Sequence, residues 1–216
     1  MRKVLFIAAI SFLSIACTKD RLKGDGNIIT EVRKPGNFTG MFSSGSSPVT
    51  ITYGLEFKVE IKGSANLIPK YKTEIRNGVI NLGYEQVNVQ DDDIEVFITM
   101  PEIKTVSMSG SGRLWIDGNF PGHEMFRLSI SGSSGTTVRG TFPTNEINVD
   151  ISGSGYAELE NIQAKKGDVR ISGSGDVRMT VENILKARIS GSGKIYYTGN
   201  ATVDSEISGS GKVIKF

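Results

Sequence analysis

Apolar and polar residues alternate along most of the chain, and this period of two predicts β-strands with one buried face. The alternation is clear at Leu128 and Ile130, which lie just before a glycine-serine phrase, and at Val177 and Met179, which lie just after another. Continuous helical periodicity is missing from the sequence. The pattern therefore predicts an all-β protein in which strand, glycine-rich corner, strand and second corner follow one another. It also predicts one buried row of isoleucines, made up of Ile130, Ile151, Ile171, Ile189 and Ile207.

The phrase Ser-Gly-Ser recurs with a period near twenty. Its first serine lies at positions 109, 131, 152, 172, 190 and 208, so successive copies are 22, 21, 20, 18 and 18 residues apart, and a degenerate copy occupies residues 44–51. A fixed period of this length is typical of a solenoid, in which stacked repeats bury a continuous core. We therefore predict a right-handed parallel β-helix with coils of about 18–22 residues, built from two facing sheets with the phrase at one corner.

The segment before residue 109 is less regular. Alternation predicts strands at 28–33, 49–52, 57–62, 72–76 and 79–83, with a tight hairpin turn at Asn77-Gly78 and a short helical turn or loop within 66–70. We expect these irregular coils to cap the solenoid, because a terminal repeat needs a different outer face. Since no linker interrupts the pattern, residues 24–216 form one predicted domain.

The first sixteen residues read as a signal peptide, with a basic start and a short apolar run that ends in Ser14-Ile15-Ala16 before Cys17. Small residues before the single cysteine of the chain resemble a bacterial lipobox. We therefore expect residues 1–16 to be removed, Cys17 to be lipidated, and residues 17–23 to link the anchor to the domain. An ordinary cleaved signal with an incidental thiol is the alternative.

Three passages, GDGNIITEVRKPGNFTGM (24–41), PEIKTVSMSGSG (101–112) and the series of SGSG coils, resemble the bacterial head GIN domain family of auto-transporter adhesins. The resemblance covers residues 24–216. It implies a right-handed β-helix that is shaped like the pectin lyases but lacks their catalytic residues. It also implies a role in adhesion, and it carries no functional residue over to this chain.

Charge and cysteine content narrow the function. Loss of Arg2 and Lys3 with the signal peptide leaves 23 basic against 23 acidic residues, and this balance gives no support for nucleic-acid binding. A phosphate-binding loop is excluded because a strand, not a helix, follows every glycine phrase. With one histidine, His123, and one cysteine, a structural zinc site is also excluded. We expect His123 in a solvent-exposed loop rather than in a catalytic triad.

Several outward positions are candidates for ligand or partner contact. Asp150, Arg170 and Arg188 fall at matching places in successive coils, a pattern typical of surface stabilisation but also open to sugar binding. Trp115 and Tyr196 share the outward parity and are the candidate stacking residues, against the interpretation of scattered surface aromatics. Asp91-Asp92-Asp93 is expected to be a solvated loop, and whether it binds a cation stays open.

The final strand breaks the repeat pattern. Ile214 and Phe216 fall on outward positions, so we expect them to form a homo-oligomer contact, with a frayed terminus as the alternative. The sequence as a whole predicts a non-enzymatic β-helix lipoprotein of the cell envelope, at the outer membrane and periplasmic or surface-exposed, that serves in adhesion, binding or assembly without a cofactor. Its expected partners are the membrane, through the lipid anchor, and a glycan or cell-surface protein. A carbohydrate-active β-helix enzyme is the alternative, by analogy of fold alone.

Overall fold

The computed structural model describes residues 21–85 and 87–216, so the predicted signal peptide and Cys17 lie outside the described residues. Nineteen strands and one short 3-10 helix make up this part of the chain, which contains no α-helix. Within it no helix has the length and apolarity to cross a membrane. The elements in chain order are β1 (Leu22–Lys23), β2 (Ile28–Arg33), β3 (Gly40–Gly45), β4 (Val49–Tyr53), β5 (Lys58–Ser64), η1 (Ile68–Lys70), β6 (Tyr71–Arg76), β7 (Val79–Tyr84), β8 (Val89–Gln90), β9 (Glu95–Met100), β10 (Thr105–Gly110), β11 (Arg113–Asp117), β12 (His123–Gly132), β13 (Gly135–Val138), β14 (Phe142–Gly153), β15 (Tyr156–Gly173), β16 (Asp176–Gly191), β17 (Lys194–Thr198), β18 (Thr202–Gly209) and β19 (Lys212–Lys215).

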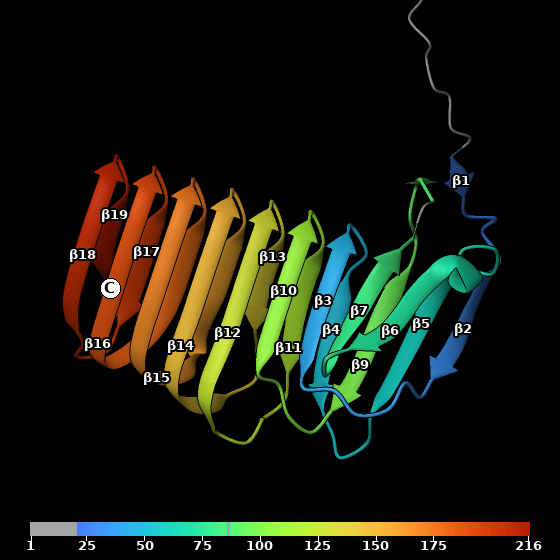
Figure 1. Cartoon of the computed structure of the whole chain (residues 1–216), viewed down its shortest axis with the longest axis horizontal. Coiled ribbons are helices and arrows are strands. Elements are labelled where there is room, and N and C mark those ends of the chain that lie inside the picture. Colours follow the sequence, from blue (N-terminus) through green and yellow to red (C-terminus); the bar gives the residue numbers. More distant parts are fainter. Residues whose placement is uncertain (1–20, 86) are drawn as a thin grey trace, which may run out of the picture.

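The strands form a β-solenoid, as predicted (Figure 1). One sheet, here called the front sheet, follows the order β6, β7, β3, β10, β12, β14, β15, β16 and β18. The facing sheet, called the back sheet, follows the order β2, β5, β9, β4, β11, β13, β15, β16, β17 and β19. Strands β15 and β16 pass through the second corner, so each contributes its first half to the back sheet and its second half to the front sheet. The chain rises in front, crosses the glycine corner and descends behind, which is right-handed winding.

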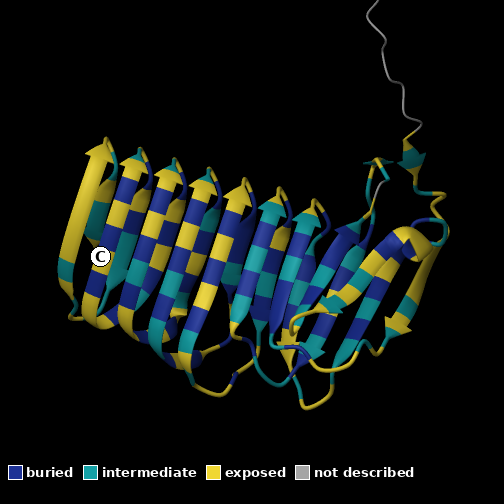
Figure 2. Cartoon of the chain, viewed as in Figure 1, coloured by how far each residue is buried: buried dark blue, intermediate teal, exposed yellow. Residues whose placement is uncertain are grey.

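Alternation within each strand sends one face of both sheets into a single core (Figure 2). A row of isoleucines shows this best, because Ile130, Ile151, Ile171 and Ile189 pair in register and are each 2% exposed. The sequence pattern also predicts Ile207 in this buried row. That prediction is wrong, since Ile207 is 41% exposed, with no further coil of the described chain against it.

The glycine phrases form the first corner, and the registers pair each phrase with the next. Gly132, Gly153, Gly173, Gly191 and Gly209 all have positive φ, between 95° and 127°. This backbone is ordinary for glycine and costly for other residues. At the second corner Phe120, Phe142 and Ile162 are buried and fill the inside of the bend, whereas Ile184, which pairs with Lys166 after a shift in register, is 40% exposed.

The N-terminal segment caps the solenoid out of sequence order. Strands β3 and β4 form a coil that pairs directly with β10 and β11. The segment between β4 and β10 turns away from the regular coils. Its strands β7 and β9 pair with the edges of β3 and β4 that lie opposite β10 and β11. The hairpin predicted at Asn77-Gly78 joins β6 to β7, and the helical turn predicted within 66–70 is η1. Leu22 and Lys23, which the sequence places in the linker, pair with β8.

Candidate functional site

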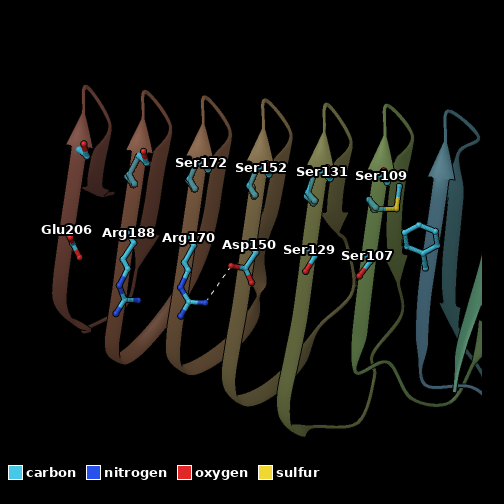
Figure 3. A pocket seen from close by; sticks show the side chains of 18 residues that line it. Ser107, Ser109, Ser129, Ser131, Asp150, Ser152, Arg170, Ser172, Arg188 and Glu206 are labelled. Atoms are coloured by element: carbon cyan, nitrogen blue, oxygen red, sulfur yellow. Dashed lines mark ion pairs between the residues drawn. The ribbon is translucent and has the colours of Figure 1, made fainter. Parts of the chain in front are cut away.

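A shallow groove runs along the outer face of the front sheet, parallel to the solenoid axis (Figure 3). One side chain per strand from each of two neighbouring rows lines this groove, whose volume is about 710 Å³. The row next to the glycine corner, called the serine row, consists of Ser109, Ser131, Ser152, Ser172, Ser190 and Ser208. Serine side chains are short, so they leave the surface hollow between the corner and the longer side chains of the next row.

The second row, called the charged row, lies two residues before the serine row in each strand. It runs from Ser107 and Ser129 through Asp150, Arg170, Arg188 and Glu206, all paired in register. The structure therefore brings together the three charged residues that the sequence places in one column. Phe42 lies at the N-terminal end of the same row, where it pairs with Ser107 and lines the groove.

The two arginines are held in place by acidic neighbours. Arg170 lies 3.7 Å from Asp150 and 3.0 Å from Asp168, and Arg188 lies 3.2 Å from Asp168. The arginine side chains are still 56% and 43% exposed, so each pair adds little to stability and leaves N–H donors free for a ligand. Asp168 is the residue that sequence reasoning missed as a bridge. Asp168 precedes Arg170 by two residues, so both side chains lie on the same face of the strand. This spacing could have identified Asp168 as a partner of the arginines from the sequence.

Trp115 and Tyr196 do not belong to this groove. They lie on the outer face of the back sheet, so the five candidate contact residues do not form a single site. They share one row, but Thr137, Glu158 and Arg178 separate them. Four strand spacings correspond to about 19 Å, which is too far for both rings to stack on one sugar.

His123 is not in an exposed loop, contrary to the sequence prediction. It is the first residue of β12, and its side chain is only 7% exposed. Its Nδ1 lies 3.4 Å from Oε1 of Glu102, and its Nε2 is buried without a hydrogen-bond partner in the described chain. Burial lowers the pKa of His123, while the Glu102 carboxylate raises it and Lys104 lowers it further. In a catalytic triad Nε2 would contact the nucleophile, and here no hydroxyl of the described chain hydrogen-bonds to it.

The three aspartates at 91–93 point to different partners. Asp91 pairs with Lys23 at 3.1 Å, Asp92 accepts hydrogen bonds from Tyr84 and Ser47, and Asp93 accepts from Ser64. Burial and then the Asp92 carboxylate raise the pKa of Tyr84. Across residues 21–85 and 87–216, no three histidine, cysteine, aspartate or glutamate residues gather as metal ligands do. The aspartates thus hold the segment before β9 against the cap strands β1, β5 and β7, and Asp92 also ties it to the corner between β3 and β4.

The groove offers donors and acceptors at each coil and no pairing of a nucleophile with a base. Fold and groove together define a β-solenoid that presents a long groove lined by a regular row of serines and a row of mostly charged side chains. The chain belongs to the family described as "Putative auto-transporter adhesin, head GIN domain", whose model matches residues 37–201. The family assignment drawn from the SGSG coils is therefore confirmed.

Solved structures share the fold at low sequence identity. A crystal structure of a "putative adhesin" from Bacteroides fragilis NCTC 9343 is similar at a TM-score of 0.70 with 16% identity, covering 90% of this chain and 100% of that chain. A "putative adhesin" from Parabacteroides distasonis ATCC 8503 has a TM-score of 0.60 with 20% identity, covering 91% and 100%. A "putative lipid binding protein" from the same strain has a TM-score of 0.57 with 20% identity, covering 91% and 99%. No curated protein matches the chain.

Proposed function

We propose that this protein is a non-enzymatic adhesion module of the cell envelope, and that it holds an extended polymeric ligand in the front groove. The groove carries the proposal, because its serine row repeats the same hydroxyl group at every coil, about 4.8 Å apart, beside a second row of mostly charged side chains. A ligand with a regular repeat along its length would meet equivalent hydrogen-bonding groups at successive coils. Membership in an adhesin family supports this role.

The charges of the groove favour a neutral, hydroxyl-rich ligand. Asp150 and Glu206 accept hydrogen bonds, Arg170 and Arg188 donate them, and the serines do both. These four charges cancel, so the groove does not select an anion or a cation. A glycan of a neighbouring cell surface has this chemistry. A catalytic role in polysaccharide breakdown is not favoured, because the two acids of the groove, Asp150 and Glu206, lie three strands or about 14 Å apart, and Asp150 is paired with Arg170.

Glycan-array binding by the chain from residue 18 onward tests the groove. All nineteen strands lie within this fragment, so the groove is complete in it. The double variant Arg170→Gln, Arg188→Gln should lose binding, whereas Lys186→Gln, on the same sheet but outside the groove lining, should keep it. Equal binding by both variants would contradict the groove. Release of reducing ends from any polysaccharide would contradict the non-enzymatic role.

We also propose that Cys17 carries the membrane anchor, as the sequence before it indicates. Two or three acyl chains would attach the protein stably, whereas one chain binds only marginally. Metabolic labelling with an alkyne fatty acid should tag the wild-type protein and leave Cys17→Ala unlabelled. Equal labelling of both would disprove the anchor. Protease treatment of intact cells then distinguishes a surface-exposed protein from a periplasmic one.

A further inference from the structure

A second row of side chains crosses the outer face of the back sheet, and the proposed groove does not involve it. The registers place one residue from each of ten adjacent strands in this back row. In spatial order the row consists of Val32, Glu60, Phe97, Thr50, Trp115, Thr137, Glu158, Arg178, Tyr196 and Ile214. The N-terminal half of the row comes from strands of the cap and of the first coils, which lie far apart in sequence.

Apolar and polar residues alternate strand by strand in that half. Val32 is 52% exposed and Phe97 is 39% exposed, although both are large apolar residues. Trp115 is half-buried two strands beyond Phe97. On the intervening strands the row is occupied by polar residues, Glu60 between Val32 and Phe97 and Thr50 between Phe97 and Trp115. Successive apolar side chains are therefore two strand spacings apart, or about 10 Å.

This spacing and alternation match one class of ligand. In an extended β-1,4-linked glycan, neighbouring sugar rings are turned over relative to each other, so equivalent ring faces recur at every second sugar. That repeat is close to two strand spacings. The C–H face of a sugar ring is apolar and packs on aromatic rings, while its hydroxyl edges need hydrogen-bonding partners.

We infer that the Val32–Phe97–Trp115 part of the back row binds a linear β-1,4-linked glycan that runs along the solenoid axis. Alternate sugar rings pack on Phe97 and Trp115, and the end of the glycan reaches Val32. Glu60, Thr50 and Thr137 accept or donate hydrogen bonds along the edges of the rings. The strands hold these groups in register before any ligand arrives, so little ordering entropy is lost on binding.

Arg139 marks the face of Trp115 that stacks. Its guanidinium lies 5.1 Å from the centre of the Trp115 ring, and the Arg139 side chain is 54% exposed with an ion pair of 3.7 Å to Asp117. An exposed cation–π contact is weak, about 0.5–1 kcal/mol. A sugar ring therefore displaces Arg139 at small cost. The row carries both signs of charge, Glu60 and Glu158 against Arg178, and Glu60 is paired with Lys58, so it does not select an anionic membrane surface as the alternative occupant.

Trp115 is the only tryptophan of the chain, so its fluorescence reports directly on this row. We would titrate the chain from residue 18 onward with cellohexaose, and with maltohexaose as an α-linked control that does not extend. Cellohexaose should shift the Trp115 emission to shorter wavelength with saturation and protect it from acrylamide. Maltohexaose should do neither. No response to cellohexaose, or an equal response to both sugars, would overturn the inference. So would a response only to vesicles of phosphatidylethanolamine and phosphatidylglycerol.

Three variants separate stacking from general surface effects. Phe97→Ala leaves Trp115 in place and should weaken cellohexaose binding roughly five- to tenfold. Arg139→Ala should bind at least as tightly as wild type. Tyr156→Ala removes an aromatic ring from a different row of the same sheet and should change nothing. Equal affinity of Phe97→Ala and wild type would overturn the inference. The groove variant Arg170→Gln, Arg188→Gln should keep the Trp115 response. The experiments therefore test ligand binding in the front groove and in the back row independently of each other.

Discussion

Gly173 lies directly against the backbone of Gly153 in the preceding coil. A β-carbon on Gly173 would lie 2.4 Å from the carbonyl oxygen of Gly153, and the φ of Gly173 is +126°. That same oxygen accepts a hydrogen bond of 2.9 Å from the amide of Ser174. The corner thus requires glycine for two separate reasons, a left-handed backbone and the close approach of adjacent coils.

We predict that Gly173→Ala destabilises the protein by at least about 2 kcal/mol, because strain and steric clash act together. Gly45→Ala is the matched control, since Gly45 has a φ of +110° but nothing within 4 Å of an added β-carbon. It should cost only the strain, about 1–2 kcal/mol. Thermal melts followed by circular dichroism measure both. Equal melting temperatures for the two variants would show that coil contact is not what requires glycine at Gly173.

The isoleucine row gives a second prediction. Ile171→Ala removes a side chain that is 2% exposed between two coils, and should cost about 2–5 kcal/mol of unfolding free energy. Ile207→Ala makes the same chemical change at a side chain that is 41% exposed, and should cost less than about 1 kcal/mol. Urea denaturation of both variants gives the comparison. Similar losses at the two positions would contradict the burial difference.

The difference between Ile171 and Ile207 also shows how much of the fold can be predicted from the sequence. Period two and the twenty-residue repeat predict the solenoid, both sheets and the register of the isoleucine row. They do not predict Ile207 correctly, because burial in a solenoid depends on the neighbouring coil as well as on parity. The order of the cap was equally hidden, since β7 and β9 stack outside β3 and β4 although they follow them in sequence.

The candidate site was predicted in part for the same reason. Equal spacing from the corner glycine placed Asp150, Arg170 and Arg188 in one column, which the registers bear out. Parity alone does not distinguish the front sheet from the back sheet, so the sequence does not separate Trp115 from candidate residues on the opposite face. Its true neighbour in the back row, Phe97, comes from the cap and shares no repeat phrase with it.

A third prediction concerns the C-terminal strand. Ile214 is half-buried, and Phe216 is 57% exposed with its ring 6.4 Å from that of Tyr196. If these side chains contact a second copy, as the sequence predicts, the chain from residue 18 should show a mass above that of the monomer at micromolar concentration. Phe216→Ser should return it to a monomer. Leu55→Ser, which changes an 82% exposed residue at the other end of the solenoid, should not. A monomer mass for the unmutated chain would disprove this contact.

The buried His123 gives a prediction on pH. Because burial lowers its pKa in the folded chain, the unfolded chain takes up a proton that the folded chain does not as the pH falls below about 6.5. The stability that the neutral imidazole contributes is therefore fully present above that pH and is lost on acidification. Glu102 opposes this effect, and Lys104 adds to it. Since His123 is the only histidine, no other side chain with an ordinary pKa titrates in this range. Melting temperatures at pH 7.5 and 5.5 should fall further for wild type than for His123→Gln, and an equal or smaller fall for wild type would mean that Glu102, not burial, controls this imidazole.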